Sequence, residues 1–229
     1  MLLHLRSSLS DVVRRPGLRR LLFESMGFGG FFKATSGFLQ PILAVGAIPV
    51  TAALLPAGSM TPAQRSVMLV GPVYFVLFLL SALASRRSHK LVSTLGGEEP
   101  AARALWGVNL IIFALLLPAS LLGYMGLIIF LFITLFALQN IWRPILVSRF
   151  DNESQESQGA TILSIESQGK SLATMVFAPL LGFLVDSAAA GDMGATPFWP
   201  VALLGSLIAF GFVFTAKKPP PPTEPPAAV

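Results

Sequence analysis

The sequence predicts an all-α integral membrane protein with six transmembrane helices. Only 12% of its 229 residues are charged, against about 25% in soluble domains, and 54% are hydrophobic. Six apolar stretches are each long enough to cross the roughly 30 Å of hydrocarbon in a bilayer. The connections between them are alternately rich and poor in basic residues, a pattern that six spans with both termini in the cytoplasm satisfy.

The predicted spans cover residues 21–45, 66–85, 104–119, 122–146, 159–185 and 197–215. They form a membrane domain over residues 21–216. Residues 1–20 are a basic cytoplasmic arm, for which two interpretations stay open: an interfacial helix on the cytoplasmic leaflet, or a mobile leader. Residues 46–65 contain three prolines and are expected to form a loop, with a short interfacial helix within it as an open alternative. Residues 217–229 are proline-rich and are expected to be extended and disordered.

Lysine and arginine fix the expected orientation, because cytoplasmic loops are enriched in them. They lie before the first span, between the second and third, between the fourth and fifth, and after the sixth: Arg6, Arg14, Arg15, Arg19, Arg20; Arg86, Arg87, Lys90, Arg103; Arg143, Arg149; Lys217, Lys218. The other three connections together hold only Arg65. We therefore expect a multi-pass protein of the inner (plasma) membrane whose first partner is the lipid bilayer.

Several function classes lack any supporting motif. The chain has no cysteine, which excludes disulfides and thiolate metal sites, and its two histidines fall in polar or terminal stretches. It carries no nucleotide loop, zinc motif or nucleophile elbow. We expect no catalytic residues, no metal, no cofactor and no enzyme activity. The net charge of +5 is attributed to cytoplasmic loops and not to nucleic-acid binding.

The first span contains a lysine close to the expected midplane. Lys33 lies about 18 Å past the start of the span, at 1.5 Å per residue. Gly29, Ser36, Gly37 and Gln40 share its helical face, which suits a cavity or a tight helix contact better than lipid. An ionisable residue inside a span is a functional-site hypothesis. Lys33 and Gln40 are therefore candidates for substrate binding.

The fifth span carries a second lysine at a similar depth, together with a glutamate. Glu166 precedes Lys170 by four residues, the spacing and order of a favourable ion pair on a helix. Two interpretations stay open: both residues bind substrate, or they form a self-neutralised pair that only lowers the cost of burial. We keep Glu166 and Lys170 as substrate-binding candidates.

Three other residues are assigned structural or orientation roles. Glu24 follows Arg20 by four residues, so an ion pair near the membrane interface explains it. Arg143 and Pro144 are expected to close the fourth span, as an interfacial arginine followed by a break in the helix.

Three stretches together resemble the C-terminal half of a major facilitator superfamily transporter. They are RRPGLRRLLF…GFLQPIL, LASRRSHKLVSTLGGEEPAAR and WRP…ATILSIES…APLLGFLVD, in an order that extends from about Asp11 to Ala216. The resemblance implies that the first span lines a central cavity and that the fifth lies nearby. Lys33 and Lys170 would then favour an anionic substrate.

Transporters of that family have two six-helix halves with the substrate site between them, and this chain supplies one. We expect a half carrier that pairs with a second six-helix half and moves a small, anionic solute. The second half is a separate polypeptide or a second copy in a homodimer, although the lysines of two copies would repel one another.

The alternative function is a non-transporting accessory or structural subunit of a larger membrane complex that retains the half-fold. Two departures from the family pattern favour this alternative. In SRRSHKL the aspartate that the loop motif usually carries is replaced. Gln158-Gly159 stand where family members often have an arginine. Both changes affect charges thought to hold the alternate states of such carriers.

Overall fold

A computed structural model describes residues 14–54, 61–154, 158–191 and 196–215, and these residues form helices without any strand. The first predicted span is divided into four segments: α2 (Pro16–Ser25), the π-helical η1 (Met26–Gly30), α3 (Phe31–Ser36) and α4 (Leu39–Leu54). The later helices are α5 (Pro62–Leu95), α6 (Glu98–Leu121), α7 (Met125–Glu153), α8 (Gly159–Ala190) and α9 (Trp199–Thr215).

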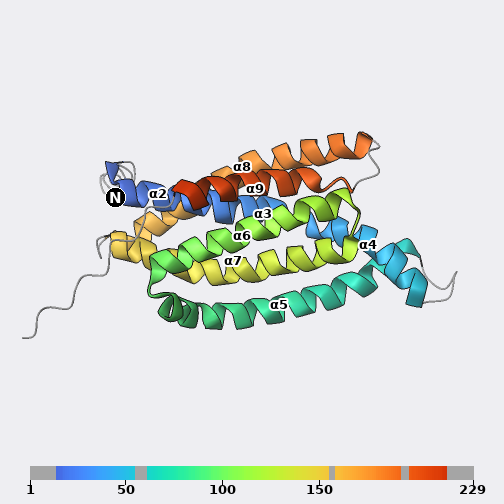
Figure 1. The fold of residues 1–229 in the computed structure, drawn as a ribbon, viewed down its shortest axis with the longest axis horizontal. Helices are drawn as coiled ribbons and strands as arrows, with labels where there is room; N and C mark the ends of the chain where they lie inside the picture. The colour runs from blue at the N-terminus through green and yellow to red at the C-terminus, as the bar shows by residue number, and fades with distance from the viewer. Residues whose placement is uncertain (1–13, 55–60, 155–157, 192–195, 216–229) are drawn as a thin grey trace, which may run out of the picture.

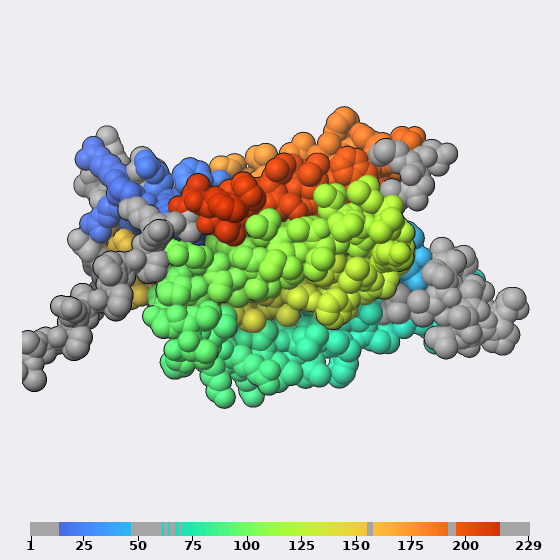
Figure 2. Space-filling model, in the orientation of Figure 1, coloured from blue at the N-terminus to red at the C-terminus, as the bar shows by residue number. Residues whose placement is uncertain are grey.

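The helices lie side by side along the long axis of the molecule. The segments from α2 to α4 follow one another in one direction, and α5, α6, α7, α8 and α9 then alternate in direction (Figure 1). The start of α2, the α5–α6 turn and the α7–α8 connection are at one end of the bundle. The α6–α7 turn is at the other end. In the space-filling view, α9, α6 and α5 run across the visible face, with α9 above α6 and α5 below it (Figure 2).

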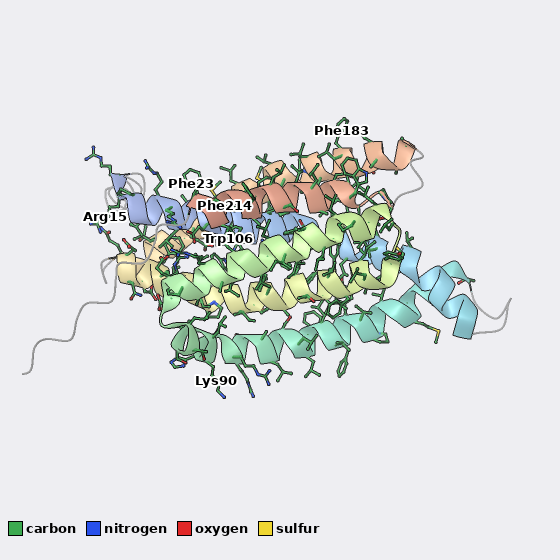
Figure 3. All side chains as sticks on the ribbon, in the orientation of Figure 1. Arg15, Phe23, Lys90, Trp106, Phe183 and Phe214 are labelled. Carbon is green, nitrogen blue, oxygen red and sulfur yellow. The ribbon has the colours of Figure 1, made fainter. Side chains whose placement is uncertain are left out.

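Four of the described helices are long and apolar enough to cross a membrane: the Val70–Leu95 part of α5, and the whole of α6, α7 and α8. The helix α9 is apolar but shorter. Large apolar side chains point outward, as Phe183 does on α8 in Figure 3, where it is 69% exposed. The described residues are therefore all helical, and four of their helices have the length and apolar composition of a membrane protein, as expected. Six crossings and a cytoplasmic location for both termini stay predictions.

Two expected boundaries move. The helix α2 begins at Pro16, inside the expected arm, because proline fits the first turn of a helix, where its missing N–H is not needed. Leu18 is already fully buried there. At the other side, α4 continues to Leu54, so residues 46–54 of the expected loop are helical. Residues 1–13, 55–60 and 217–229 lie outside the described residues, so the expectations for them stay predictions.

The break expected at Pro144 is wrong, because α7 continues through this residue to Glu153. Each of the other long helices also contains an internal proline: Pro72 in α5, Pro118 in α6 and Pro179 in α8. Proline removes one backbone hydrogen bond, but inside a packed membrane bundle neighbouring helices and local adjustments satisfy the carbonyl that is left. Arg143 and Arg149 are therefore helical residues, not parts of a connection.

An aromatic cluster joins four elements in the core. The ring of Phe28 from η1 stacks on Trp142 from α7, with centroids 4.4 Å apart, and meets Trp106 from α6 edge-on at 4.9 Å. Trp106 in turn stacks on Phe212 from α9 at 4.4 Å. Figure 3 places Trp106 within the bundle. These contacts fix η1 against the middle of the bundle, next to Arg143.

Glycine allows two close helix approaches. A Cβ atom on Gly205 of α9 would lie 2.4 Å from the ring of Phe113 on α6. A Cβ atom on Gly30 of η1 would lie 2.7 Å from the Cβ of Ala173 and 3.0 Å from the backbone oxygen of Lys170, both on α8. The hydroxyl of Thr174 donates a hydrogen bond to the carbonyl of Gly30 at 3.1 Å. The backbone of η1 and α8 are therefore in direct contact.

We expect Gly30→Ala to destabilise the protein, because the new methyl group would clash with the backbone of α8 and with a Cβ atom that cannot rotate away. Overpacking of this kind lowers the free energy of unfolding by about 1–3 kcal/mol. Thermal unfolding of each variant in detergent measures the change.

Gly182→Ala is the matched control, because a Cβ atom at Gly182 in α8 meets nothing within 4 Å. Alanine is the better helix former, so this variant is expected to be as stable as the wild type or more stable, by up to about 1 kcal/mol. An equal loss in both variants would show that the close contact at Gly30 is not the cause.

Candidate functional site

Polar residues and one glycine, spaced four apart along the chain, face one another from three parts of the bundle. The spacing of four places successive members on one side of a helix. Ser25, Gly29 and Lys33 come from α2, η1 and α3; Gln139 and Arg143 come from α7; Glu166 and Lys170 come from α8. We call Lys33, Arg143, Glu166 and Lys170 the cationic cluster.

Glu166 is at the centre of the cationic cluster and is completely buried. Its Oε1 atom accepts a hydrogen bond from Nη1 of Arg143 at 2.8 Å and another from the hydroxyl of Ser25. The Nζ atom of Lys170 lies 3.8 Å from the same oxygen. The Glu166–Lys170 ion pair expected from the spacing is therefore present, but the shorter contact is to Arg143 on another helix.

Arg143 is a member of this site that the sequence analysis assigned to the helix end. The helix continues for ten residues beyond it, so Arg143 lies about 15 Å inside α7. Its side chain is 39% exposed and pairs with Glu166 on α8. The incorrect break at Pro144 concealed this depth. The position of Arg143 one helical turn after Gln139, on the same helical face, could have indicated that Arg143 belongs to this site.

The two lysines predicted to lie at matching depth lie close together. The helical turn that precedes Lys33 contacts Lys170 through Gly29 and Gly30. The side chain of Lys33 is exposed and makes no hydrogen bond or ion pair among the described residues. A Cβ atom on Gly29 would lie 3.0 Å from Cδ of Lys170, so the missing side chain at this glycine leaves room for the lysine.

Gln40 does not join the cluster. The helix α3 ends at Ser36, and a turn at residues 37–38 separates it from α4. Gln40 is an exposed residue in the first turn of α4, and its side chain makes no hydrogen bond to any other part of the chain that the structure describes. The single continuous helical face that was expected to hold both Lys33 and Gln40 is interrupted.

The cationic cluster contains three cationic side chains and one carboxylate. Two buried oxygens beside it have no hydrogen-bond partner among the described residues: Oε2 of Glu166 and Oε1 of Gln139. No group of three histidine, cysteine, aspartate or glutamate residues is close enough to hold a metal within the described ranges. What the arrangement offers chemically is excess positive charge and N–H donors, which suits an anion.

A second group of charges lies at the end of the bundle where α2 begins. Arg149 of α7 is 4% exposed, and its Nη1 lies 2.6 Å from Oε2 of Glu24. Its Nη2 lies 2.7 Å from Oε1 of Glu99, in the first turn of α6. The expected pair of Arg20 with Glu24 is present at 2.8 Å. We call Arg20, Glu24, Glu99 and Arg149 the end network.

The end network joins α2, α6 and α7. Only its local pair, Arg20 with Glu24, was expected from the sequence. Arg149 had been placed in a connection, where it would be solvated. In the structure, the last two residues of α2 connect the end network with the cationic cluster. Glu24 belongs to the end network, and the next residue, Ser25, donates its hydroxyl hydrogen to Glu166.

Replacing Arg149 by methionine is expected to lower the free energy of unfolding by about 3 kcal/mol, because it leaves the buried Glu24 carboxylate without its closest cation. The control is Arg19→Met, an exposed arginine on α2, whose removal is expected to change stability by no more than about 0.5 kcal/mol. Chemical or thermal unfolding in detergent distinguishes them. Similar small effects for both variants would mean that the end network does not stabilise the bundle.

Glu166→Gln keeps the shape of the side chain but removes the only negative charge of the cationic cluster. We expect a loss of about 2–3 kcal/mol in stability, because Arg143, Lys170 and Lys33 then repel one another inside the bundle. Adding Lys170→Met should restore part of that loss, a coupling that a double-mutant cycle measures. Asp151→Asn, at an exposed position near the end of α7, serves as the control. Additive losses without any recovery would contradict the charge argument.

Comparison with protein-family models, with curated proteins and with solved structures found no match for this chain. The relationship to the major facilitator superfamily accordingly stays a resemblance in the sequence. In the structure, a buried carboxylate is in contact with two cations, Arg143 and Lys170, on helices that are long and apolar enough to cross a membrane.

Proposed function

We propose that this chain is a half carrier. It pairs with a second six-helix half in the inner (plasma) membrane, both termini in the cytoplasm, and moves a small anionic solute. The observation that carries the proposal is the cationic cluster: Arg143 and Lys170 share one buried carboxylate, and Lys33 adds a third cation beside them. A functional role is the first interpretation of ionisable groups within membrane helices.

Exposure of these groups favours a water-filled or partner-covered face over lipid. Lys33 is exposed, Arg143 is 39% exposed and Lys170 is 20% exposed, and Arg143 and Lys170 lie well inside helices that are long and apolar enough to cross a bilayer. Hydrocarbon does not solvate such charges. Carriers with paired halves place substrate sites near the midplane between the halves. A second half that covers this face would enclose the cluster in such a site.

A separate polypeptide fits as the second half better than a second copy does. The cationic cluster has more positive than negative groups, and a symmetric homodimer would set two such clusters against each other. Like charges close together disfavour their charged forms. A partner chain with its own residues at this face avoids that repulsion.

One observation favours the accessory-subunit alternative. Glu166 already compensates part of the charge of Arg143 and Lys170 within the chain. A cluster of this kind also stabilises a helix bundle without any substrate. In that case the chain would occupy a fixed place in a larger membrane complex, and the face bearing Lys33 would be covered permanently.

Transport assays test the two functions. The full chain, together with any chain that co-purifies from the membrane, is reconstituted in liposomes, and uptake of labelled organic and inorganic anions is measured. Lys33→Ala and Lys170→Ala are each expected to lower the rate of uptake by about tenfold or more, because each removes a charge from a part-buried site. Lys90→Ala is the control, because Lys90 is exposed and points away from the bundle on α5 (Figure 3).

Unchanged uptake in both cluster variants would remove the cationic cluster from the transport path. The oligomeric state in nanodiscs provides the second readout. A dimer or a heteromeric pair is expected for a carrier. A stable monomer without uptake, or a fixed complex that transports nothing, would support the accessory alternative instead.

A further inference from the structure

We infer that the solute held at the cationic cluster is a dianion, a small molecule with two negative charges. The inference rests on the proposed function and names the substrate class of the same site. It starts from charge balance: Lys33, Arg143 and Lys170 contribute three positive charges, and Glu166 contributes one negative charge. The cluster is therefore left with an excess of two positive charges in a part of the chain where charge needs compensation.

No other described group supplies the missing negative charge. The acidic residues Glu24 and Glu99 are engaged with Arg149 in the end network, which a separate set of contacts holds together. Glu98 accepts hydrogen bonds from Ser148 and Asn152 at the same end of the bundle. The compensation must therefore come from outside the described residues. A singly charged solute would leave one positive charge uncompensated, whereas a doubly charged one leaves none.

Hydrogen-bond donors remain available for such a solute. The guanidinium of Arg143 has five N–H groups, and its only hydrogen bond among the described residues is to Oε1 of Glu166. Lys170 lies 3.8 Å from that oxygen, which is too far for a hydrogen bond, so its three N–H groups are uncommitted. Lys33 is exposed beside them and makes no ion pair in the described ranges. Cations and unused donors thus lie on one side of a buried carboxylate.

The positions of the three cations explain why one carboxylate does not suffice. Glu166 directs Arg143, Lys170 and Ser25 toward the same oxygen, Oε1, while Oε2 is buried without any partner. Lys33 lies one helical turn after Gly29, whose Cβ position is 3.0 Å from Cδ of Lys170, and it forms no ion pair with a carboxylate among the described residues. An anion that bridges Lys33 and Lys170 would make an attractive contact with each lysine.

Two pairs of probes that differ by one charge test the inference. The first pair is succinate and monomethyl succinate, and the second is sulfate and methyl sulfate. Binding of each to the full chain in nanodiscs is measured by calorimetry at pH 7.5 and one fixed ionic strength, since salt screens such contacts. The dianion of at least one pair is expected to bind about tenfold tighter than its monoanion, because an added charge contact at a part-buried site has that magnitude or more.

Variants test whether the preference for dianions over monoanions depends on the cationic cluster. Lys33→Met is expected to weaken dianion binding by about tenfold and to leave monoanion binding less affected, so that the ratio between the two falls. Lys90→Met removes an exposed lysine that points away from the bundle and is expected to leave both affinities unchanged. Thermal unfolding of each variant confirms that the fold is retained.

The outcomes distinguish the dianion inference from the proposed carrier function. Monoanions that bind as tightly as their dianions, with both weakened by Lys33→Met, would overturn the dianion inference and leave the proposed anion carrier intact. Absence of binding by all four probes would overturn both, and would agree with a cluster that an acidic residue of a partner chain already neutralises. A dianion preference that survives Lys33→Met unchanged would place the bound anion elsewhere and overturn the assignment.

Discussion

Burial of the Glu166 carboxylate requires cations beside it, and the fold brings them from two helices. An isolated carboxylate in a low-dielectric interior is costly enough that it must be paired or neutralised. Arg143 from α7 and Lys170 from α8 meet at one oxygen of Glu166, and Ser25 at the end of α2 donates to the same atom. This single side chain therefore links α2, α7 and α8.

The local part of this arrangement follows from sequence, and the long-range part does not. Arg20 with Glu24 and Glu166 with Lys170 are four residues apart, so helix geometry alone brings them together. The pairs of Arg149 with Glu24 and of Arg143 with Glu166 depend on how the helices pack, which spacing along the chain does not encode. Proline added a specific error, because a helix end placed at Pro144 left both arginines near solvent. The helical stretches themselves were predictable, since apolar runs of that length have few alternatives.

The glycines of η1 have a packing role that composition alone does not reveal. Gly30 lets its segment touch the backbone of α8, and Gly29 leaves space for the side chain of Lys170. A π-helical turn inserts an extra residue into the helix, and such turns occur often at functional sites. Phe28, which directly precedes these glycines, packs against Trp142 and Trp106. Rigid aromatic contacts and close backbone packing thus surround the cationic cluster on the side of the first span.

The neighbouring positions of Glu24 and Ser25 have a consequence for how the molecule responds to a change at Glu166. Glu24 contacts Arg149 and Ser25 contacts Glu166, and one peptide unit separates the two residues. Peptide units are rigid planes, so their ends move together. A rotation of the tip of α2 would move both residues. The tip of α2 thus connects the end network with the buried carboxylate inside the bundle.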